Sequence, residues 1–419
     1  MKILFSGLSV VYPVSGVGQY TLQLGRALET LLGNGNIFWF GNNASGRGNE
    51  YSDHETPNSI NRVRHRLKKG LREVPGFKTL VHLLRNHQFR SYVRRVTPSL
   101  YHETNYTPFC FDQGPTIVTV CDLSFVRHPE WHPKDRVEHF EKFCLKKLSQ
   151  ADAIVTISEF SKKEIIDLLG INPAKIYVTP LGVHRCFKPG QKRMQDIPEG
   201  YILFLGNLEP RKNLPTLLNA YRSLPRNLRE RHPLVIAGAS GWYTKELRTA
   251  LRLFEGDEKP ILTGYVPQRL LPDLYRGASL FVYPSLYEGF GLPVLEAMAS
   301  GVPVITSNSS SLPEVVGDAG VLVNPYDVDH LKEAMMGFLE DEKARRELRE
   351  KGIARAKPFS WDKCARETIE VYKKALQNGL PALTHANHEH FKMDDLGRGD
   401  LLPFPESPPS QLKLNKEQD

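Results

Sequence analysis

Short apolar runs of strand length alternate with longer amphipathic segments through most of the chain. The runs lie at residues 2–6, 37–40, 100–101, 116–120 and 153–157 in the first half, and at residues 201–205, 234–237, 261–262, 280–283, 302–305 and 321–323 in the second. Short buried strands that alternate with helices are typical of parallel sheets covered on both faces. The pattern predicts an α/β protein with two Rossmann-like domains that face a cleft.

The segments between the apolar runs predict the organisation of the chain. Helices are expected at residues 18–32, 134–148, 159–169, 331–338 and 361–376, and Ser158 is placed to cap the third of them. A linker rich in Pro, Gly and Lys at residues 188–198 separates a first domain, residues 1–187, from a second, residues 199–358, and a last helical segment follows at residues 359–378. Residues 380–419 contain five prolines, seven acidic residues and few aliphatic ones, which predicts a disordered tail.

Composition narrows the class of protein. A chain of 419 residues with 40% hydrophobic and 24% charged residues is ordinary for a globular protein with two full cores. No apolar run approaches the roughly 20 residues that span a bilayer, and the start of the chain fits a first strand better than a signal peptide. The five cysteines are scattered without metal-type spacing, which predicts a reducing, cytoplasmic setting.

The net charge of +8 is unevenly distributed. The first domain is predicted to carry an insertion at about residues 50–95, and residues 61–95 contain eleven Lys or Arg against one acidic residue, Glu73. Three interpretations stay open: a solvated helical face, a nucleic-acid patch or a site for anionic lipids. No nucleic-acid motif accompanies the charges, so we expect no nucleic-acid partner. Leucines interleave with the charges as in interfacial helices, which favours peripheral association with the inner face of the membrane over the nucleic-acid patch.

The stretch Glu288-Gly-Phe-Gly-Leu-Pro-Val-Leu-Glu296 connects an apolar strand to a helix. Open α/β sheets bind ligands at the carboxyl ends of their strands, and glycines let backbone N–H groups approach an anion. Carboxylates beside a phosphate are costly unless hydroxyls donate to them, so sugar and ribose hydroxyls are the expected partners of the two glutamates. The ordinary alternative is helix-terminal charge for Glu288 and a solvated face for Glu296. A diphosphate-bearing donor would also contact the loop between them, at Gly289, Phe290, Gly291 and Leu292.

This segment resembles the E-x7-E signature of the retaining family 4 glycosyltransferases, which have the GT-B fold. The resemblance extends over residues 284–304 and continues in Ser311-Leu-Pro-Glu-Val and Gly317-Asp-Ala-Gly, and it covers roughly residues 1–378. It implies that the C-terminal helix crosses back onto the first domain. It also implies that Glu288 meets the donor sugar and that Glu296 meets the nucleotide ribose.

The segment Phe204-Leu-Gly-Asn-Leu-Glu-Pro-Arg-Lys-Asn-Leu214 is a second strand, turn and helix start. Arg-Lys pairs in loops usually face solvent. This pair, however, is predicted to lie at the same cleft as the segment Glu288–Glu296, called the glutamate loop below. Two fixed cations can stabilise a leaving diphosphate without a metal. The segment resembles the family's phosphate clamp, which implies catalytic roles for Arg211 and Lys212 and donor binding at Gly206. Asn207 stands where many members carry Arg, so the sequence leaves open which of the two cations carries more of the charge.

The resemblance implies further site residues. His102 is expected to contact the donor sugar, although a lone histidine at a strand end is more often structural. Cys121 departs from the histidine that relatives frequently carry there. The remaining donor-binding positions implied by the resemblance are Gly16, Gly18, Gly238 and Val266.

The predicted chemistry needs neither a metal nor a cofactor. Asp327-Val-Asp329 looks like the D-x-D metal motif of another glycosyltransferase fold, but its position before a helix favours N-terminal capping. We therefore expect a retaining, metal-independent glycosyltransferase that uses a saccharide or lipid-linked acceptor. The motifs resemble bacterial mannosyltransferases that use GDP-mannose, with UDP-glucose-type donors next. Two alternatives are a nucleotide-sugar epimerase on the same fold and a non-catalytic sugar-nucleotide binding protein.

Overall fold

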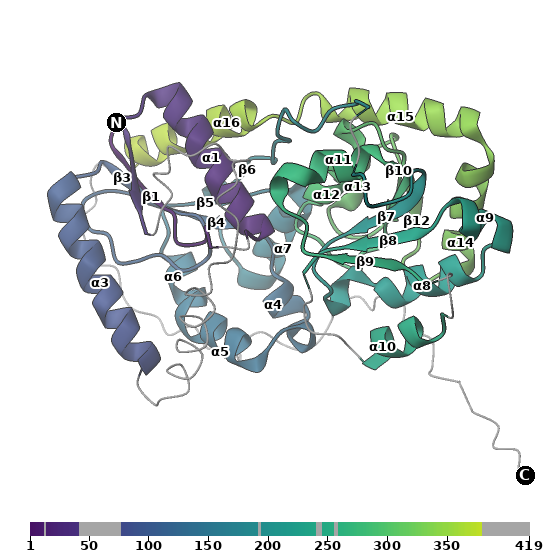
Figure 1. The fold of residues 1–419 in the computed structure, drawn as a ribbon. Coiled ribbons are helices and arrows are strands. Elements are labelled where there is room, and N and C mark those ends of the chain that lie inside the picture. Colours follow the sequence, from purple (N-terminus) through teal and green to yellow (C-terminus); the bar gives the residue numbers. More distant parts are fainter. Residues whose placement is uncertain (12–13, 42–76, 192–193, 240–244, 255–258, 379–419) are drawn as a thin grey trace, which may run out of the picture. The chain divides into compact units, whose positions relative to one another are not determined.

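The computed structural model describes residues 1–11, 14–41, 77–191, 194–239, 245–254 and 259–378. It contains two six-stranded sheets in which every described strand pair is parallel (Figure 1). The two α/β units predicted from the apolar pattern are thereby confirmed. The predicted tail and the part of the basic insertion before residue 77 lie outside the described residues.

The first sheet has the order β2-β1-β3-β4-β5-β6. Its strands are β1 (Ile3–Ser6), β2 (Ile37–Phe40), β3 (Leu100–Glu103), β4 (Thr116–Val120), β5 (Ala153–Thr156) and β6 (Ile176–Val178). The side chains of β1, β3 and β5 are buried throughout, because helices cover both faces of the sheet. The helices of this half are α1 (Gly16–Leu32), α3 (Phe77–Val96), α4 (Ser124–Arg127), α5 (Lys134–Phe143), α6 (Leu145–Ser149) and α7 (Glu159–Leu169).

The second sheet has the order β12-β11-β10-β7-β8-β9. Its strands are β7 (Tyr201–Leu205), β8 (Leu234–Ala237), β9 (Ile261–Gly264), β10 (Ala278–Tyr283), β11 (Val304–Ser307) and β12 (Val321–Val323). The helices of this half are α8 (Leu214–Arg222), α9 (Arg226–Arg231), α10 (Lys245–Arg252), α11 (Leu271–Arg276), α12 (Leu292–Ala299), α13 (Leu312–Val316), α14 (Val328–Glu340) and α15 (Glu342–Ala356). The chain leaves β7 toward β8 on one side and later returns to β10 on the other, so the sheet order reverses between β7 and β10.

Helix boundaries agree with the capping chemistry in the sequence. The Ser158 side chain accepts a hydrogen bond from Ser161 N at the start of α7, as predicted. Asp327 likewise accepts from His330 N and begins α14 at Val328. The helix predicted at residues 134–148 is instead divided at Cys144 into α5 and α6.

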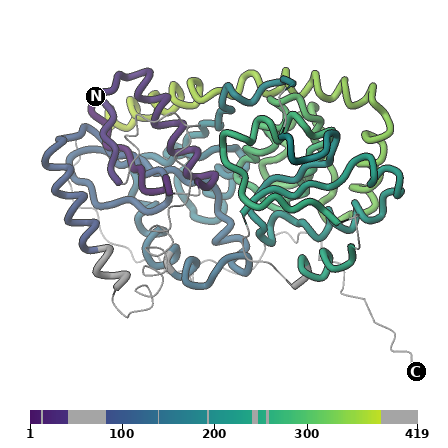
Figure 2. The backbone as a smooth tube through the Cα atoms, viewed as in Figure 1, coloured from purple at the N-terminus to yellow at the C-terminus, as the bar shows by residue number. Residues whose placement is uncertain are grey.

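The last helix, α16 (Trp361–Asn378), packs along α1 in the first half, as the resemblance implied (Figure 2). The rings of Tyr20 and Trp361 lie 6.4 Å apart at this contact. Just before α16, Val183 N donates a hydrogen bond to Phe359 O over 3.1 Å. The two stretches of chain that connect the halves therefore touch each other.

Candidate functional site

Two loops at the carboxyl ends of β7 and β10 carry the candidate site. These neighbouring strands mark the reversal of the second sheet's order, and open α/β sheets bind ligands at such switch points. The loop after β7 contains the 3-10 helix η3 (Pro210–Lys212), and the loop after β10 leads into α12. Leu286 N donates to Arg211 O over 2.8 Å and ties the loops together. The fold thus brings the two predicted motifs into one place.

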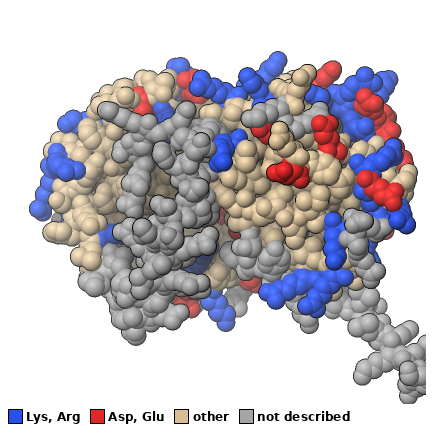
Figure 3. All heavy atoms as spheres, in the orientation of Figure 1, with Lys and Arg blue, Asp and Glu red and all other residues tan. Residues whose placement is uncertain are grey.

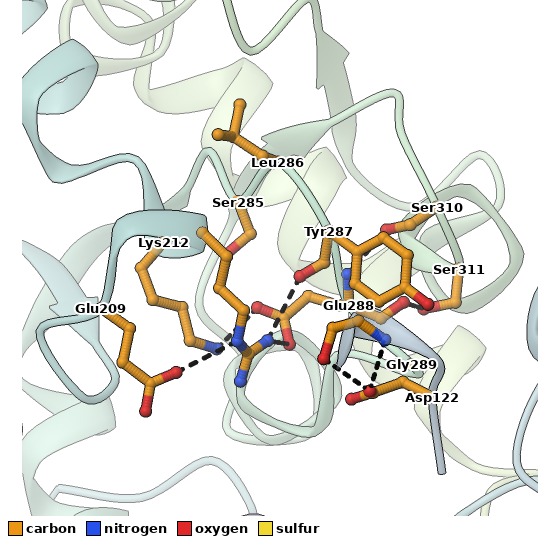
Figure 4. A network of polar contacts seen from close by, with 12 residues as sticks. Asp122, Glu209, Lys212, Ser285, Leu286, Tyr287, Glu288, Gly289, Ser310 and Ser311 are labelled. Carbon is orange, nitrogen blue, oxygen red and sulfur yellow. Dashed lines mark hydrogen bonds and ion pairs between the residues drawn. The ribbon is translucent and has the colours of Figure 1, made fainter. Parts of the chain in front are cut away.

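The carboxylate of Glu288 is the centre of a buried polar network (Figure 4). Arg211 Nη1 donates to its Oε2 over 2.7 Å, and Lys212 Nζ donates to its Oε1 over 2.6 Å. Tyr283 Oη donates to the same Oε1 over 2.9 Å. Burial by itself would raise the pKa of Glu288, but the Arg211 and Lys212 cations outweigh burial and lower it to about 2. Glu288 is therefore ionised at neutral pH.

The two cations differ in their surroundings. The Lys212 side chain is 7% exposed and contacts the Tyr283 hydroxyl, whereas the Arg211 side chain is 20% exposed. Burial and the neighbouring Arg211 lower the pKa of Lys212. Burial opposes the charge of Arg211 too, but Glu288 and Glu209 hold its pKa above the usual range. Arg211 is consequently the permanently charged member of the pair, and it is the one nearer to solvent.

Hydrogen bonds from a serine turn fix the backbone on both sides of the Glu288 side chain. Glu288 N donates to Ser310 Oγ over 2.9 Å, and Ser311 Oγ donates to Glu288 O over 2.8 Å. Ser310 has a φ of 54°, in the left-handed region that non-glycine residues seldom adopt. The resemblance included Ser311, but the role of this serine turn in holding the loop was not predicted.

Glycine is required at two positions of the loop for different reasons. A Cβ on Gly289 would lie 2.2 Å from the carbonyl oxygen of Cys121, at the end of β4. Gly291 has a φ of 107° and precedes the first residue of α12, Leu292. Phe290 is 4% exposed and packs against Phe359, with ring centroids 5.9 Å apart. Whether these residues contact a donor stays a prediction.

Glu296 lies on α12 and is 6% exposed. Its Oε2 accepts a hydrogen bond from Tyr275 Oη over 2.9 Å. Burial raises the pKa of Glu296 to about 8, although the Tyr275 hydrogen bond acts in the opposite direction. The two glutamates of the motif therefore differ in charge at neutral pH, because Glu288 has Arg211 and Lys212 beside it. A neutral carboxyl can both donate to and accept from ribose hydroxyls, and this role stays a prediction.

The remaining predicted glycines lie at strand ends and in the first turn of α1. Gly206 and Gly238 follow β7 and β8, and a Cβ on Gly238 would lie 2.0 Å from Gly206 O. A Cβ on Gly18 would lie 2.9 Å from Ser9 O, whereas Gly16 has open space around it. Gly206 and Gly238 lie beside the loop after β7 that carries Arg211 and Lys212. Val266 is buried and follows β9. Their contacts with a donor stay predictions.

His102 is not brought together with Glu288 in this conformation. It is fully buried, and its two ring nitrogens lie 2.6 Å from Tyr372 Oη and 2.8 Å from Thr119 Oγ1. Burial lowers the pKa of His102 to about 3, so the ring is neutral. Thr119 Oγ1 in turn lies 2.9 Å from Tyr20 Oη. The imidazole thus links α16 to the first sheet, and a contact with the donor sugar, which stays a prediction, would need these partners to move.

Several contacts between the first half and the glutamate loop were not predicted. Leu123 N donates to Tyr287 Oη over 3.1 Å, and that hydroxyl also donates to Glu164. Ser161 Oγ lies 3.1 Å from Cys121 O and 3.4 Å from Gly289 O. Tyr287 directly precedes Glu288 in the sequence. It could therefore have been selected as a residue that packs against the site. These contacts place the end of β4 against the loop.

Comparison with known proteins agrees with this architecture. The profile described as "Glycosyl transferases group 1" matches residues 191–355, and the profile described as "Glycosyltransferase Family 4" matches residues 14–185. The chain is 37% identical over 387 residues to the "O-antigen chain mannosyltransferase B" of Escherichia coli, covering 89% of this chain and all of that protein. It is 36% identical over 296 residues to the "Serotype-specific mannosyltransferase WbdA" of Escherichia coli, covering 66% of this chain and 36% of that protein. The solved structure of sucrose-phosphate synthase from Thermosynechococcus elongatus has a TM-score of 0.66 at 20% identity, covering 90% of this chain and all of that one.

Two parallel Rossmann-like sheets and a C-terminal helix that returns to the first of them are the architecture of the GT-B fold. The matches extend through both halves of the chain. The protein belongs to glycosyltransferase family 4 and is a hexosyltransferase.

Proposed function

We propose that this glycosyltransferase transfers a mannosyl group from GDP-mannose, with retention of configuration and without a metal, to a saccharide or lipid-linked acceptor. The acceptor would belong to surface polysaccharide or glycolipid assembly on the cytoplasmic side of the membrane. The observation that carries the proposal is the convergence of Arg211 and Lys212 on the buried carboxylate of Glu288, 2.7 and 2.6 Å away.

The two cations suit a departing diphosphate. Fixed positive charges in a site of low dielectric stabilise negative charge far better than water does, and they need no reorganisation when the bond breaks. Arg211, which is part-exposed, can bind phosphate oxygens in a bidentate manner, while Lys212 supplies a point charge behind it. The protein then provides the charge that a divalent metal provides in other transferases.

The same geometry favours retention by attack on the front face of the sugar. Double displacement needs a free carboxylate as nucleophile. Glu288 is held by two cations and the Tyr283 hydroxyl, and the cations outweigh burial and lower its pKa to about 2, so it is a poor nucleophile. In the proposed route the acceptor oxygen bonds to the anomeric carbon as the bond to diphosphate breaks, and the hydroxyl proton moves to the departing phosphate oxygen.

Mannose is favoured by the relatives. Two Escherichia coli proteins among those that match this chain are named mannosyltransferases, and one of them is matched over its full length. The motifs Leu208-Glu-Pro-Arg-Lys-Asn213 and Tyr287-Glu-Gly-Phe-Gly291 support the same donor by resemblance.

A lipid-linked acceptor is supported by the surface of α3. The described face of this helix exposes Leu83 and Leu84, at 59% and 55%, together with the arginines Arg85, Arg90, Arg94 and Arg95. Lys and Arg side chains are visible at the edge of the molecule where α3 lies (Figure 3). A cavity of about 540 Å³ beside α3 is lined by Arg90, Arg94 and Lys147 and by the rings of Phe109 and Phe111. Anionic lipid headgroups suit such a surface. No helix among the described residues is long and apolar enough to cross a membrane.

The test is a donor panel. Purified protein is mixed with GDP-mannose, UDP-glucose or other nucleotide sugars, and thermal shift identifies those that bind. NMR of the product formed with the donor that the enzyme uses then determines the anomeric configuration of the new glycosidic bond. We expect stabilisation by GDP-mannose and an α-linked product. Binding of uridine donors alone would overturn the choice of donor, and an inverted product would overturn the front-face route.

A further inference from the structure

His132 has a ring nitrogen that the fold leaves unused. It lies between the 3-10 helix η1 (Pro129–Trp131) and α5, and its Nε2 is buried without a hydrogen-bond partner among the described residues. The ring stacks on Phe125, with centroids 4.1 Å apart and an interplanar angle of 29°. A buried polar atom without a partner is costly, which makes this nitrogen a candidate for a hydrogen bond to a ligand or to an ordered water.

The segment that carries His132 packs against the glutamate loop. The rings of His128 and Trp131 lie 5.9 and 6.5 Å from the ring of Tyr287. The carbonyl oxygen of Tyr287 accepts a hydrogen bond from Arg211 Nη1 over 3.2 Å. The charges of Glu209 and Arg211 act on the His132 ring, so His132 lies near the phosphate clamp but on the first half of the chain, whereas Arg211 and Lys212 lie on the second.

Four charged groups act on the imidazole. Burial is the largest influence and lowers the pKa of His132. The carboxylates of Asp122, at the end of β4, and Glu209, before η3, favour the protonated ring, whereas Arg211 and Arg136, on α5, oppose it. The ring is consequently neutral at neutral pH in the absence of a ligand.

We propose that His132 completes the diphosphate site, with Nε2–H donating a hydrogen bond to a phosphate oxygen of the bound nucleotide sugar. The inference rests on the proposed function and extends the clamp to a third residue. Since the diphosphate brings negative charge next to the ring, binding raises the affinity of the imidazole for a proton. Donor binding then takes up a proton from solution, and the affinity falls as pH rises.

Isothermal titration calorimetry with GDP-mannose, and with UDP-glucose in parallel, tests this inference. The phosphates of these diesters do not titrate between pH 6 and 8.5, so proton uptake reports on the protein. Titrations in buffers of different ionisation enthalpy give the number of protons bound. His132→Phe keeps the ring that stacks on Phe125 but lacks the ring nitrogens. His132→Gln keeps an N–H donor. His330→Gln, at an exposed position on α14, is the matched control.

We expect wild type and His330→Gln to take up a proton at neutral pH and to bind about tenfold more weakly for each pH unit through the titration, the limit for one coupled proton. His132→Phe should bind about tenfold more weakly at pH 6 and lose the pH slope below pH 7, where Glu296 stays protonated, with an unchanged melting temperature as evidence of folding. His132→Gln should recover part of the affinity but not the slope. Equal affinity, slope and proton count in wild type and His132→Phe would overturn this inference alone. Failure of the wild type to bind any nucleotide sugar would overturn the proposed function together with it.

Discussion

Lys212 Nζ lies 2.6 Å from Glu288 Oε1, and both side chains are less than a tenth exposed. A charge buried this deeply is tolerated only with a partner. Without a donor, Glu288 and Glu209 together therefore neutralise the two cations that a diphosphate would meet. The donor therefore enters a site in which both cations are already in place but are paired with carboxylates.

Replacing Lys212 tests the importance of this pair for the reaction. Lys212→Met keeps the length of the side chain but removes the charge that stabilises the departing diphosphate. We expect kcat to fall by about 10²–10³-fold, the loss typical when a preorganised donor to a developing anion is removed. Steady-state kinetics measures the effect. The control is Lys343→Met, at a side chain that is 82% exposed. A loss of only a few-fold in Lys212→Met would remove the residue from the catalytic set.

Chelation tests the proposal that Arg211 and Lys212 act in place of a metal. Activity measured after dialysis against EDTA is expected to match that of the untreated enzyme. Asp327 caps α14 by accepting from His330 N over 2.9 Å, which is the structural role expected from its position. Complete loss of activity, restored by Mg²⁺ or Mn²⁺, would contradict this expectation and make Asp327 and Asp329 candidates for metal ligands.

The two glutamates are expected to affect different kinetic constants. Glu296→Ala should weaken binding of the nucleoside diphosphate by about 1–3 kcal/mol, because ribose hydroxyls lose a buried partner. Glu288→Ala should mainly reduce turnover. Calorimetry with the bare nucleotide measures the first effect and kinetics the second. Equal nucleotide affinity of wild type and Glu296→Ala would rule out the ribose role.

Glu296 should also make stability depend on pH. Burial raises its pKa from 4.5 to about 8, so between these values the folded protein holds a proton that the unfolded chain releases. The free energy of unfolding therefore falls as pH rises through this window. Glu296→Gln removes the titration, and its stability relative to wild type should increase from pH 5 to pH 8 in denaturant unfolding. A constant difference across the window would show that Glu296 is ionised in the fold.

Gly289 should not tolerate a side chain. The Cβ of Gly289→Ala would lie 2.2 Å from Cys121 O, so the glutamate loop or the end of β4 must shift. We expect loss of most activity and a lower melting temperature. Gly337→Ala, in α14 with open space around the position, is the control and should be neutral or stabilising by up to about 1 kcal/mol. Wild-type activity in Gly289→Ala would show that the two segments do not need this close approach.

The arginines of α3 should determine binding to anionic lipid. Co-sedimentation with anionic vesicles is expected for wild type at low salt and should fade as ionic strength rises. Arg85, Arg90, Arg94 and Arg95 changed together to Gln should reduce it strongly, and neutral vesicles should bind neither protein. A variant with Lys343, Arg346, Lys351 and Lys357, around α15, changed to Gln controls for total charge. Equal binding by both variants would assign the effect to overall charge.

The apolar pattern predicted every described strand except β6, because parallel strands buried on both faces leave little ambiguity, whereas β6 is a short edge strand with only one buried residue. The differences have tertiary or stereochemical causes. β11 begins at Val304, two residues later than predicted, because Pro303 has no N–H to donate to the ladder. The helix predicted through Cys144 is divided there, where its Sγ lies 2.7 Å from Thr107 Oγ1, a contact that local periodicity does not reveal.

The sequence motifs identified residues that the fold brings together, but not the contacts between residues that are distant in sequence; their roles toward a donor stay predictions. The loop with Glu288 and the pair Arg211-Lys212 were both found, but not that they would neutralise each other across 76 residues of sequence. His102 lies next to Tyr372, which is 270 positions away, so its burial depends on where α16 docks. His132 follows no strand directly and belongs to no motif, so it was not selected from the sequence.

The contact between Val183 and Phe359 has a consequence for motion. The chain connects its two sheets twice, and at Gly182 the two connections approach so closely that a Cβ would lie 2.1 Å from Trp361 N. Two adjacent, hydrogen-bonded connections can bend together about one axis, but twisting would shear the bond between them. They therefore form a double-stranded hinge that permits opening and closing and resists rotation. A bulky residue at position 182 would alter the rate of substrate exchange without touching either substrate.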